Sequence, residues 1–349
     1  MSGCPTIPTS SEHAWAGSST PAGTGRGHVI GPSNGVPPLA PSSGSVAARL
    51  GPMAELDHFP ELAGGIERLE LLPGGLTNRN YRVTTTSGRR LVARFSSAKS
   101  ALLAIDRDAE FHNSRAAATV GIGPGVVNYS SAQGIMLVEW IEGRTFEAAT
   151  LDDANQLQRI AAGCIRLHSG PRFVNDFDMF ALQRRYLDIV HEFGFRLPSD
   201  YLEFQPQVAR LHTVLRATAT GTVPCHNDLL AANIMDDGRI WFIDYEYSGN
   251  NDACFELGNI WSEAALAPDR LEHLVTAYYG RASAALVARA RLFGLMSKYG
   301  WTLWASIQDA VSDVDFDFWS WGMEKYARAV AEFRGPDFDR LINDISPST

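Results

Sequence analysis

The sequence has few of the residues that mark disulfide scaffolds, zinc domains and membrane spans. It contains only four cysteines in 349 residues, and none of them forms a Cys-x-x-Cys pair. Neither a disulfide framework nor a zinc site is therefore indicated. No uninterrupted apolar stretch reaches the roughly 18 residues that a membrane helix needs. We predict a cytoplasmic protein with reduced thiols and no membrane span.

Positive charge is also scarce. The chain has 30 lysines and arginines against 39 aspartates and glutamates, which gives a formal net charge of −9. A surface that binds nucleic acid needs lysine and arginine opposite the phosphates, so no nucleic-acid partner is expected. An acidic chain is compatible with a small cationic ligand. The composition leaves the oligomeric state open between a monomer and a homodimer.

The first 50 residues differ in composition from the rest of the chain. Of these residues, 28 are Ser, Thr, Gly or Pro, and the only charged ones are Glu12, Arg26 and Arg49. Such a segment buries too little apolar surface to offset the entropy lost on ordering. We predict a disordered tail over residues 1–52, and Met53 could be an alternative start of the compact protein.

The remaining sequence predicts an α+β protein with two lobes. Strands are expected at 66–72, 80–85, 90–95, 126–129 and 135–140, with one helix at 105–118 between them. A helix is expected to begin at Asp152-Asp153 and to stop at Gly170-Pro171, and further helices are expected at about 178–193, 200–217, 268–293 and 295–310. We therefore predict a small β-rich lobe over 53–141 and a larger, mostly helical lobe over 142–349.

A β-like island in the helical half carries the strongest chemical signal. It contains His226-Asn227-Asp228, then Asn233, an Asp-Gly turn, an apolar strand and Asp244. The turn predicts a hairpin whose open end brings Asn233 and Asp244 together. In phosphoryl transfer, one carboxylate orients and deprotonates the attacking hydroxyl, here Asp228. A carboxylate and an amide oxygen hold Mg²⁺ on the nucleotide phosphates, here Asp244 and Asn233.

The β-rich half offers a complementary set of phosphate-binding residues. Glycines between two strands allow the backbone close to phosphates, although an ordinary hairpin turn is the alternative interpretation. Arg94, on a predicted strand, could hold the nucleotide phosphates, and Glu110, on the following helix, could orient it through an ion pair. The glycines between the two strands are Gly74 and Gly75, and they lie in the segment Gly74-Gly75-Leu76-Thr77-Asn78.

Several stretches make the chain resemble the choline/ethanolamine kinase family, within the aminoglycoside phosphotransferase group of kinase-like enzymes. They include LLPGGLTNRNYRV, IDRDAEFHN, CHNDLLAANIM, IDYEYSGNNDACFELGN and WTLWASIQ. The resemblance implies a protein-kinase-like fold, with ATP and Mg²⁺ bound between the lobes. It also implies that Glu246 acts at the metal or near a cationic substrate. The backbone of the segment 137–141, with Glu139 and Ile141, would meet adenine.

The substrate is less constrained than the reaction. The resemblance makes Trp301, Trp304 and Trp321 a cage for the ammonium group of choline or ethanolamine, and ordinary helix packing is the alternative for each ring. An aminoglycoside, thiamine or another hydroxylated cation remains a second substrate hypothesis. A catalytically inactive relative that binds a ligand is a third hypothesis. Inactive relatives usually lose one of the residues at the positions of Asp228, Asn233 and Asp244, and all three are present in this sequence.

Overall fold

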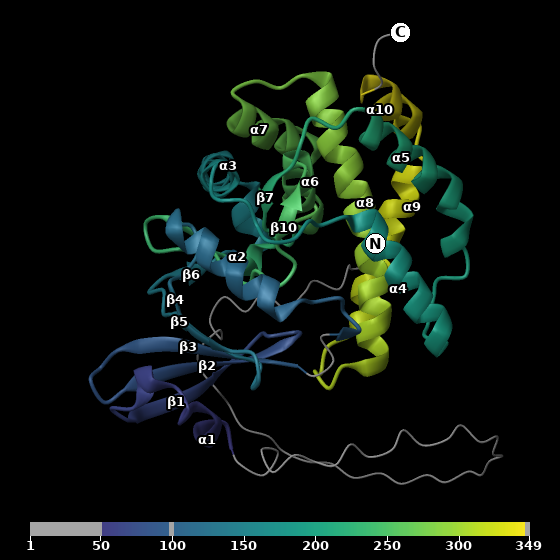
Figure 1. Ribbon diagram of the computed structural model, residues 1–349. Coiled ribbons are helices and arrows are strands. Elements are labelled where there is room, and N and C mark those ends of the chain that lie inside the picture. The colour runs from purple at the N-terminus through teal and green to yellow at the C-terminus, as the bar shows by residue number, and fades with distance from the viewer. Residues whose placement is uncertain (1–50, 98–100, 346–349) are drawn as a thin grey trace, which may run out of the picture.

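A five-stranded antiparallel sheet forms the smaller of two lobes in the computed structural model, which describes residues 51–97 and 101–345 (Figure 1). Its strands lie in the order β1-β2-β3-β5-β4. Each begins and ends within two residues of its predicted position. The bounds are β1 (Ile66–Leu72), β2 (Asn78–Thr85), β3 (Arg90–Ser96), β4 (Val126–Ser130) and β5 (Ile135–Glu139).

The sheet has a hydrophobic core of its own. Leu91, Ala93 and Phe95 alternate along β3 and point to the same face of the sheet. Leu56, from the short helix α1 (Pro52–Leu56), packs into this core and is fully buried. The core is separate from the one that holds the helices together, which agrees with a two-lobed molecule.

Helix α2 (Arg107–Thr119) connects the sheet to the larger lobe. Asp106 caps its first turn by accepting hydrogen bonds from two backbone N–H groups. Asn113, at the middle of the helix, donates to Ser248 Oγ over 3.0 Å and to Asn175 Oδ1 over 2.8 Å. Ala117 packs into the core of the larger lobe. The helix therefore holds the sheet in a fixed position against the larger lobe.

The larger lobe is mostly helical, and α8 and α9 are packed against each other along much of their length (Figure 1). Its helices are α3 (Ala154–His168), α4 (Met179–Phe193), α5 (Gln205–Ala217), α6 (Ala253–Glu263), α7 (Pro268–Tyr279), α8 (Ala284–Val311), α9 (Phe318–Phe333) and α10 (Asp337–Ile345). Its short strands are β6 (Arg144–Thr145), β7 (Val223–Cys225), β8 (Ile234–Asp236), β9 (Ile240–Phe242) and β10 (Gly249–Asn251). The predicted α+β architecture is confirmed.

The prediction of the helix break near residue 294 was wrong. The chain breaks instead at Gly280, which adopts a φ of 72° and ends α7. Gly294 lies inside α8, where a Cβ atom would come within 2.6 Å of the Gly258 carbonyl oxygen. A glycine that reads as a helix breaker in the sequence is used here for close packing of α6 against α8.

Two further expectations concern the tail and the membrane. All but the last two residues of the predicted disordered tail, 1–52, lie outside the described residues. Over residues 51–97 and 101–345, no helix combines the length and the hydropathy that a membrane crossing requires.

Candidate active site

The predicted hairpin places Asn233 beside the chain that leads to Asp244. Strands β8 and β9 pair in antiparallel register, and Ile243 N–H donates to the Asn233 carbonyl oxygen over 2.9 Å. Asp244 itself has a φ of 70°, in the left-handed region that few non-glycine residues adopt. Such strain persists only where surrounding contacts determine it, which is common at functional sites.

Asp228 lies on the loop just before Asn233. The Asn233 side chain donates its Nδ2 hydrogen to the Asp228 carbonyl oxygen over 2.8 Å, and the adjacent Leu229 N–H donates to Asn259 Oδ1 over 3.0 Å. Asn259 therefore braces this loop from α6. Burial raises the pKa of Asp228 well above its ordinary value, and the negative charge of Glu263 raises it further.

The oxygen atoms of Asn233 and Asp244 suit Mg²⁺. The Asn233 amide nitrogen is occupied by the Asp228 carbonyl, which leaves the amide oxygen as the ligand atom. Asp244 uses Oδ1 in an ion pair with Arg94, which leaves Oδ2. Carboxylate and amide oxygens are the ligands that this hard cation prefers.

Arg94 forms the predicted ion pair with Glu110. Arg94 Nη1 lies 2.8 Å from Glu110 Oε1, and both side chains are buried. Burial alone would lower the pKa of Arg94, but the carboxylates around it raise that pKa above its ordinary value. The guanidinium is therefore held as a cation beside Asp244, the candidate metal ligand.

Glu246 joins the two lobes through four groups of the smaller lobe. Its carboxylate accepts hydrogen bonds from Thr77 Oγ1 at 2.9 Å, Asn78 Nδ2 at 2.9 Å, Arg94 Nη2 at 3.0 Å and Arg107 Nη1 at 3.1 Å. Burial and the charge of Asp244 raise the pKa of Glu246, and the arginines oppose that rise. These four partners of Glu246 all lie on the nucleotide side of the predicted site.

Sequence reasoning missed Arg107. Its guanidinium contacts Glu110 Oε2 at 2.7 Å as well as Glu246, and it donates to Asn78 Oδ1 over 2.8 Å. A signal was present in the sequence, because Arg107 and Glu110 are three residues apart and share one face of a helix. We call Arg94, Arg107, Glu110 and Glu246 the interlobe charge cluster.

The glycine-rich turn lies between β1 and β2, as predicted. Gly74 has a φ of 94°, and a Cβ atom on Gly75 would lie 2.2 Å from the Asn78 carbonyl oxygen. Both positions therefore require glycine. Gln308, on α8, donates to the Leu76 carbonyl oxygen over 3.0 Å, which ties the turn to the helix that carries two of the predicted cage tryptophans.

The predicted adenine-binding segment, 137–141, runs from the end of the sheet toward the larger lobe. Glu139 is the last residue of β5, its side chain is exposed, and its N–H donates to the Gly125 carbonyl oxygen over 2.8 Å. Ile141 is buried. The chain then enters β6, which pairs with β8 of the catalytic hairpin.

The three predicted cage tryptophans gather around Tyr247 and each other. The Trp301 ring meets Tyr247 edge-on at 4.8 Å, and Trp304 Nε1 donates to the Tyr247 hydroxyl over 2.8 Å. Trp321 lies edge-on to Trp304 at 5.6 Å between ring centres. Glu246 is the neighbour of Tyr247 in sequence, but its contacts described above are to the other lobe.

Two charged residues beside these rings were also missed. Lys325, four residues after Trp321 on α9, holds its ammonium group 4.1 Å from the centre of the Trp321 ring and forms an ion pair with Glu263. Glu263 ends α6, seven residues after Glu256. The sequence signal was the i, i+4 spacing of Trp321 and Lys325 on an apolar helix.

A buried cluster braces the catalytic loop from behind. Glu256 accepts hydrogen bonds from the backbone N–H groups of His226 at 3.2 Å and Asn227 at 2.9 Å. His226 Nε2 lies 2.8 Å from the Ile243 carbonyl oxygen, and burial lowers the pKa of His226 to about 4. His226 is therefore a structural pin for the loop, and Glu256 holds the loop through two backbone N–H groups.

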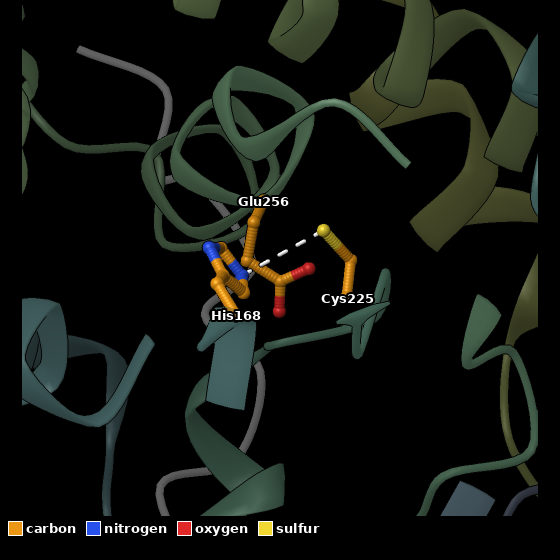
Figure 2. Close-up of side chains that lie close together, drawn as sticks. All are labelled: His168, Cys225 and Glu256. Atoms are coloured by element: carbon orange, nitrogen blue, oxygen red, sulfur yellow. Dashed lines mark hydrogen bonds between the residues drawn. The ribbon is translucent and has the colours of Figure 1, made fainter. Parts of the chain in front are cut away.

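Figure 2 shows that His168, Cys225 and Glu256 meet at this brace. His168 Nε2 lies 3.6 Å from Cys225 Sγ, and the other ring nitrogen contacts the Tyr278 hydroxyl at 2.7 Å. Burial lowers the pKa of His168 to about 3 and raises that of Cys225, so both are neutral. Both Glu256 oxygens already accept backbone hydrogen bonds, which marks the cluster as structural.

Comparison with known proteins agrees with this geometry. The sequence model described as choline/ethanolamine kinase matches residues 69–275, more than half of the chain. Ethanolamine kinase 1 of Mus musculus is 27% identical over 304 residues, which cover 74% of this chain and 82% of the mouse protein. Protein LicA of Haemophilus influenzae is 28% identical over 215 residues, which cover 59% of this chain and 61% of that protein.

Solved structures show the same fold. A choline/ethanolamine kinase family protein from Mesorhizobium loti superposes with a TM-score of 0.73 and 30% identity, covering 84% of this chain and 97% of that one. An aminoglycoside phosphotransferase superposes with a TM-score of 0.58 and 17% identity, covering 79% of this chain and 98% of that one. The architecture described above is thus that of the protein-kinase-like fold.

Proposed function

The chain belongs to the choline/ethanolamine kinase family, and on this premise we propose that it phosphorylates the hydroxyl group of a small cationic amino alcohol, ethanolamine or choline. The general reaction is that of an ATP-using phosphotransferase with an alcohol acceptor. The observation that carries the proposal is the meeting of Arg94, Asp244 and Glu246 across the two lobes, next to the loop of Asp228.

The nucleotide would bind between the lobes. The backbone of Gly74 and Gly75, with Thr77 and Asn78 after them, would lie over the phosphates. Arg94, oriented by Glu110, would contact phosphate oxygens, and the backbone of 137–141 would meet adenine. Asn233 and Asp244 would hold Mg²⁺, which, when bound, neutralises charge on the phosphates.

Asp228 would act on the acceptor hydroxyl. In the transfer step, the hydroxyl oxygen forms a bond to the γ-phosphorus, and the bond from that phosphorus to the bridging oxygen of ADP breaks. The hydroxyl proton passes to Asp228, whose raised pKa favours accepting it. The Asn233 and Asn259 contacts hold the loop so that its carboxylate is already oriented.

The aromatic group around Tyr247 would bind the cationic end of the substrate. Trp301, Trp304 and Trp321 offer ring faces, and each cation–π contact contributes about 0.5 to 2 kcal/mol. Replacing one of these tryptophans with alanine should therefore raise the KM for the amino alcohol about threefold to thirtyfold. The KM for ATP should change little. Glu246 would act on the other side, by holding the arginines of the interlobe charge cluster.

A substrate panel tests the proposal. We expect ADP release from ATP with ethanolamine or choline, and none above background with thiamine or several aminoglycosides. The Asp228→Asn variant serves as the control for contaminating kinases. Activity confined to an aminoglycoside or to thiamine would replace the proposed substrate class. Tight amino alcohol binding without turnover would identify an inactive relative.

A further inference from the structure

The protein's own cation lies against the aromatic group of the proposed substrate site. Lys325 comes from the middle of α9 and Glu263 from the last residue of α6, and their ion pair is almost completely buried. The ammonium nitrogen lies 4.1 Å from the centre of the Trp321 ring. One face of Trp321 is therefore already engaged by a cation.

Glu263 keeps one oxygen atom without a partner. Oε2 binds Lys325, whereas Oε1 is buried and has no hydrogen-bond partner among the described residues. Buried carboxylate oxygens are nearly always hydrogen-bonded, because leaving one unpaired is costly. Glu263 Oε1 can therefore accept a hydrogen bond from a donor that the protein itself does not provide.

The pair acts electrostatically on the reaction centre. The negative charge of Glu263 and the positive charge of Lys325 both act on the pKa of Asp228, and Glu263 has the larger effect of the two. In ethanolamine and choline the nitrogen is only two carbons away from the hydroxyl. A group that recognises the nitrogen must therefore lie close to the residue that contacts the hydroxyl.

We propose that the Glu263–Lys325 pair makes the enzyme select amino alcohols whose nitrogen carries an N–H bond, ethanolamine before choline. This inference rests on the proposed function. Lys325 occupies a face of Trp321 and one oxygen of Glu263, and the substrate nitrogen must donate to the other oxygen. A primary ammonium group can make that hydrogen bond, and a quaternary ammonium group has no N–H with which to make it.

The methylation series of the substrate tests the inference directly. We expect kcat/KM to fall from ethanolamine through its N-methyl and N,N-dimethyl derivatives to choline. The largest step should accompany loss of the last N–H. A hydrogen bond to a buried charged group corresponds to about a tenfold to hundredfold preference. A wild-type kcat/KM for choline equal to or above that for ethanolamine would overturn the inference.

Variants of Lys325 test the residue itself. Lys325→Ala frees the Trp321 face and the second Glu263 oxygen, so the ratio of kcat/KM for ethanolamine over choline should fall at least about fivefold. Lys325→Arg keeps a cation in place and should preserve the preference. Lys298→Ala is a matched control, because Lys298 is also buried, is paired with Glu332 and lies 4.7 Å from the Trp261 ring centre.

The outcomes separate this inference from the proposed function. If ethanolamine and choline are both phosphorylated but Lys325→Ala changes their ratio no more than Lys298→Ala does, the role of Lys325 is refuted and the proposed function stands. If neither amino alcohol is phosphorylated, the proposed function itself fails. If Lys325→Ala does not fold, Lys325→Met, which removes the charge and keeps most of the volume, is measured against the same control.

Discussion

The interlobe charge cluster and the Glu263–Lys325 pair are two charged regions that are built in different ways. The interlobe charge cluster draws its members from β3, α2 and the segment after β9, and each charge has several partners. The Glu263–Lys325 pair is formed by two helices of one lobe, and one carboxylate oxygen is left over. The several ion pairs of each residue in the interlobe charge cluster fix the positions of its side chains. The free oxygen of Glu263, in contrast, is available to accept a hydrogen bond from a ligand.

This difference predicts how each region responds to mutation. Loss of one member of the interlobe charge cluster leaves the others paired, so its effect should be moderate. Asp228 and Asp244, which we propose contact the reacting hydroxyl and the metal, have no substitutes, so their loss should have the largest effect. The predictions below follow that order.

The largest effect is expected for Asp228→Asn and Asp244→Ala. General-base assistance contributes about 10² to 10⁴ in rate, and loss of a metal ligand should cost at least as much. Turnover should fall by these factors while the melting temperature stays within a few degrees of the wild type. Steady-state kinetics on the substrate that the wild type accepts, with circular dichroism as the folding control, measure both. Near-normal turnover in either variant would refute its assignment.

The brace behind the catalytic loop should show a pH signature. Glu256 has a pKa of about 7 in the folded protein, because burial raises it from 4.5, while His168 and Cys225 stay neutral across this range. A raised acid pKa stabilises the fold at pH values below 4.5, and that contribution is lost as the pH rises through 7. The shift corresponds to about 3 kcal/mol at most.

Glu256→Gln removes this titration. The free energy of unfolding of the variant, relative to the wild type, should therefore increase between pH 4.5 and pH 8, and denaturant titrations at both values measure it. The variant should also lose about tenfold in kcat, since Gln offers one acceptor atom where two backbone N–H groups need one each. A pH-independent difference in unfolding free energy would show that Glu256 does not titrate in this range.

Arg107→Ala tests whether the interlobe charge cluster is redundant. Because Arg94 still pairs with Glu110 and Glu246, we expect the KM for ATP to rise only about threefold to tenfold, with little change in the KM for the amino alcohol. Arg159→Ala is the matched control, because Arg159 forms a two-pronged ion pair with Asp236 near the catalytic hairpin. A loss as large as that of Asp244→Ala would show that the cluster has no redundancy.

The sequence predicted the parts of this site that depend on local order. The catalytic hairpin was predictable because its turn and its apolar strands are continuous in the chain, and the Arg94–Glu110 pair because strand and helix follow each other directly. The partners of Glu246 were not predictable, since Thr77 and Asn78 lie more than 160 residues away in sequence. Such contacts depend on how the lobes are placed.

The two missed residues beside the tryptophans share a property. Glu263 and Lys325 are charged residues on apolar helices, where a charge is ordinarily expected to face solvent. Their burial becomes visible only when α6 and α9 are packed together, because each neutralises the other. The helix break was predicted near residue 294 instead of at Gly280 for the same reason. The close packing of Gly294 on Gly258 outweighs the local preference of glycine for a helix break.

The smallest effect is expected at the hydrogen bond between Gln308 and Leu76, which links the glycine-rich turn to α8. Gln308 donates to the Leu76 carbonyl oxygen, and its helix also carries Trp301 and Trp304. This bond connects the nucleotide side to the substrate side, so Gln308→Ala should raise the KM for ATP and the KM for the amino alcohol together. A single neutral hydrogen bond contributes about 0.5 to 1.5 kcal/mol, which corresponds to a change of about twofold to tenfold.

A matched variant isolates that effect. Gln205 also donates from its side-chain nitrogen to a residue of α8, the Tyr299 hydroxyl, which lies nine residues before Gln308 in the sequence. Gln205→Ala should therefore leave both constants unchanged while costing similar stability. If Gln308→Ala raises only the KM for ATP, the turn acts on the nucleotide alone. The interlobe charge cluster would then affect only nucleotide binding. The Glu263–Lys325 pair would affect only amino alcohol binding, and the two regions would act independently.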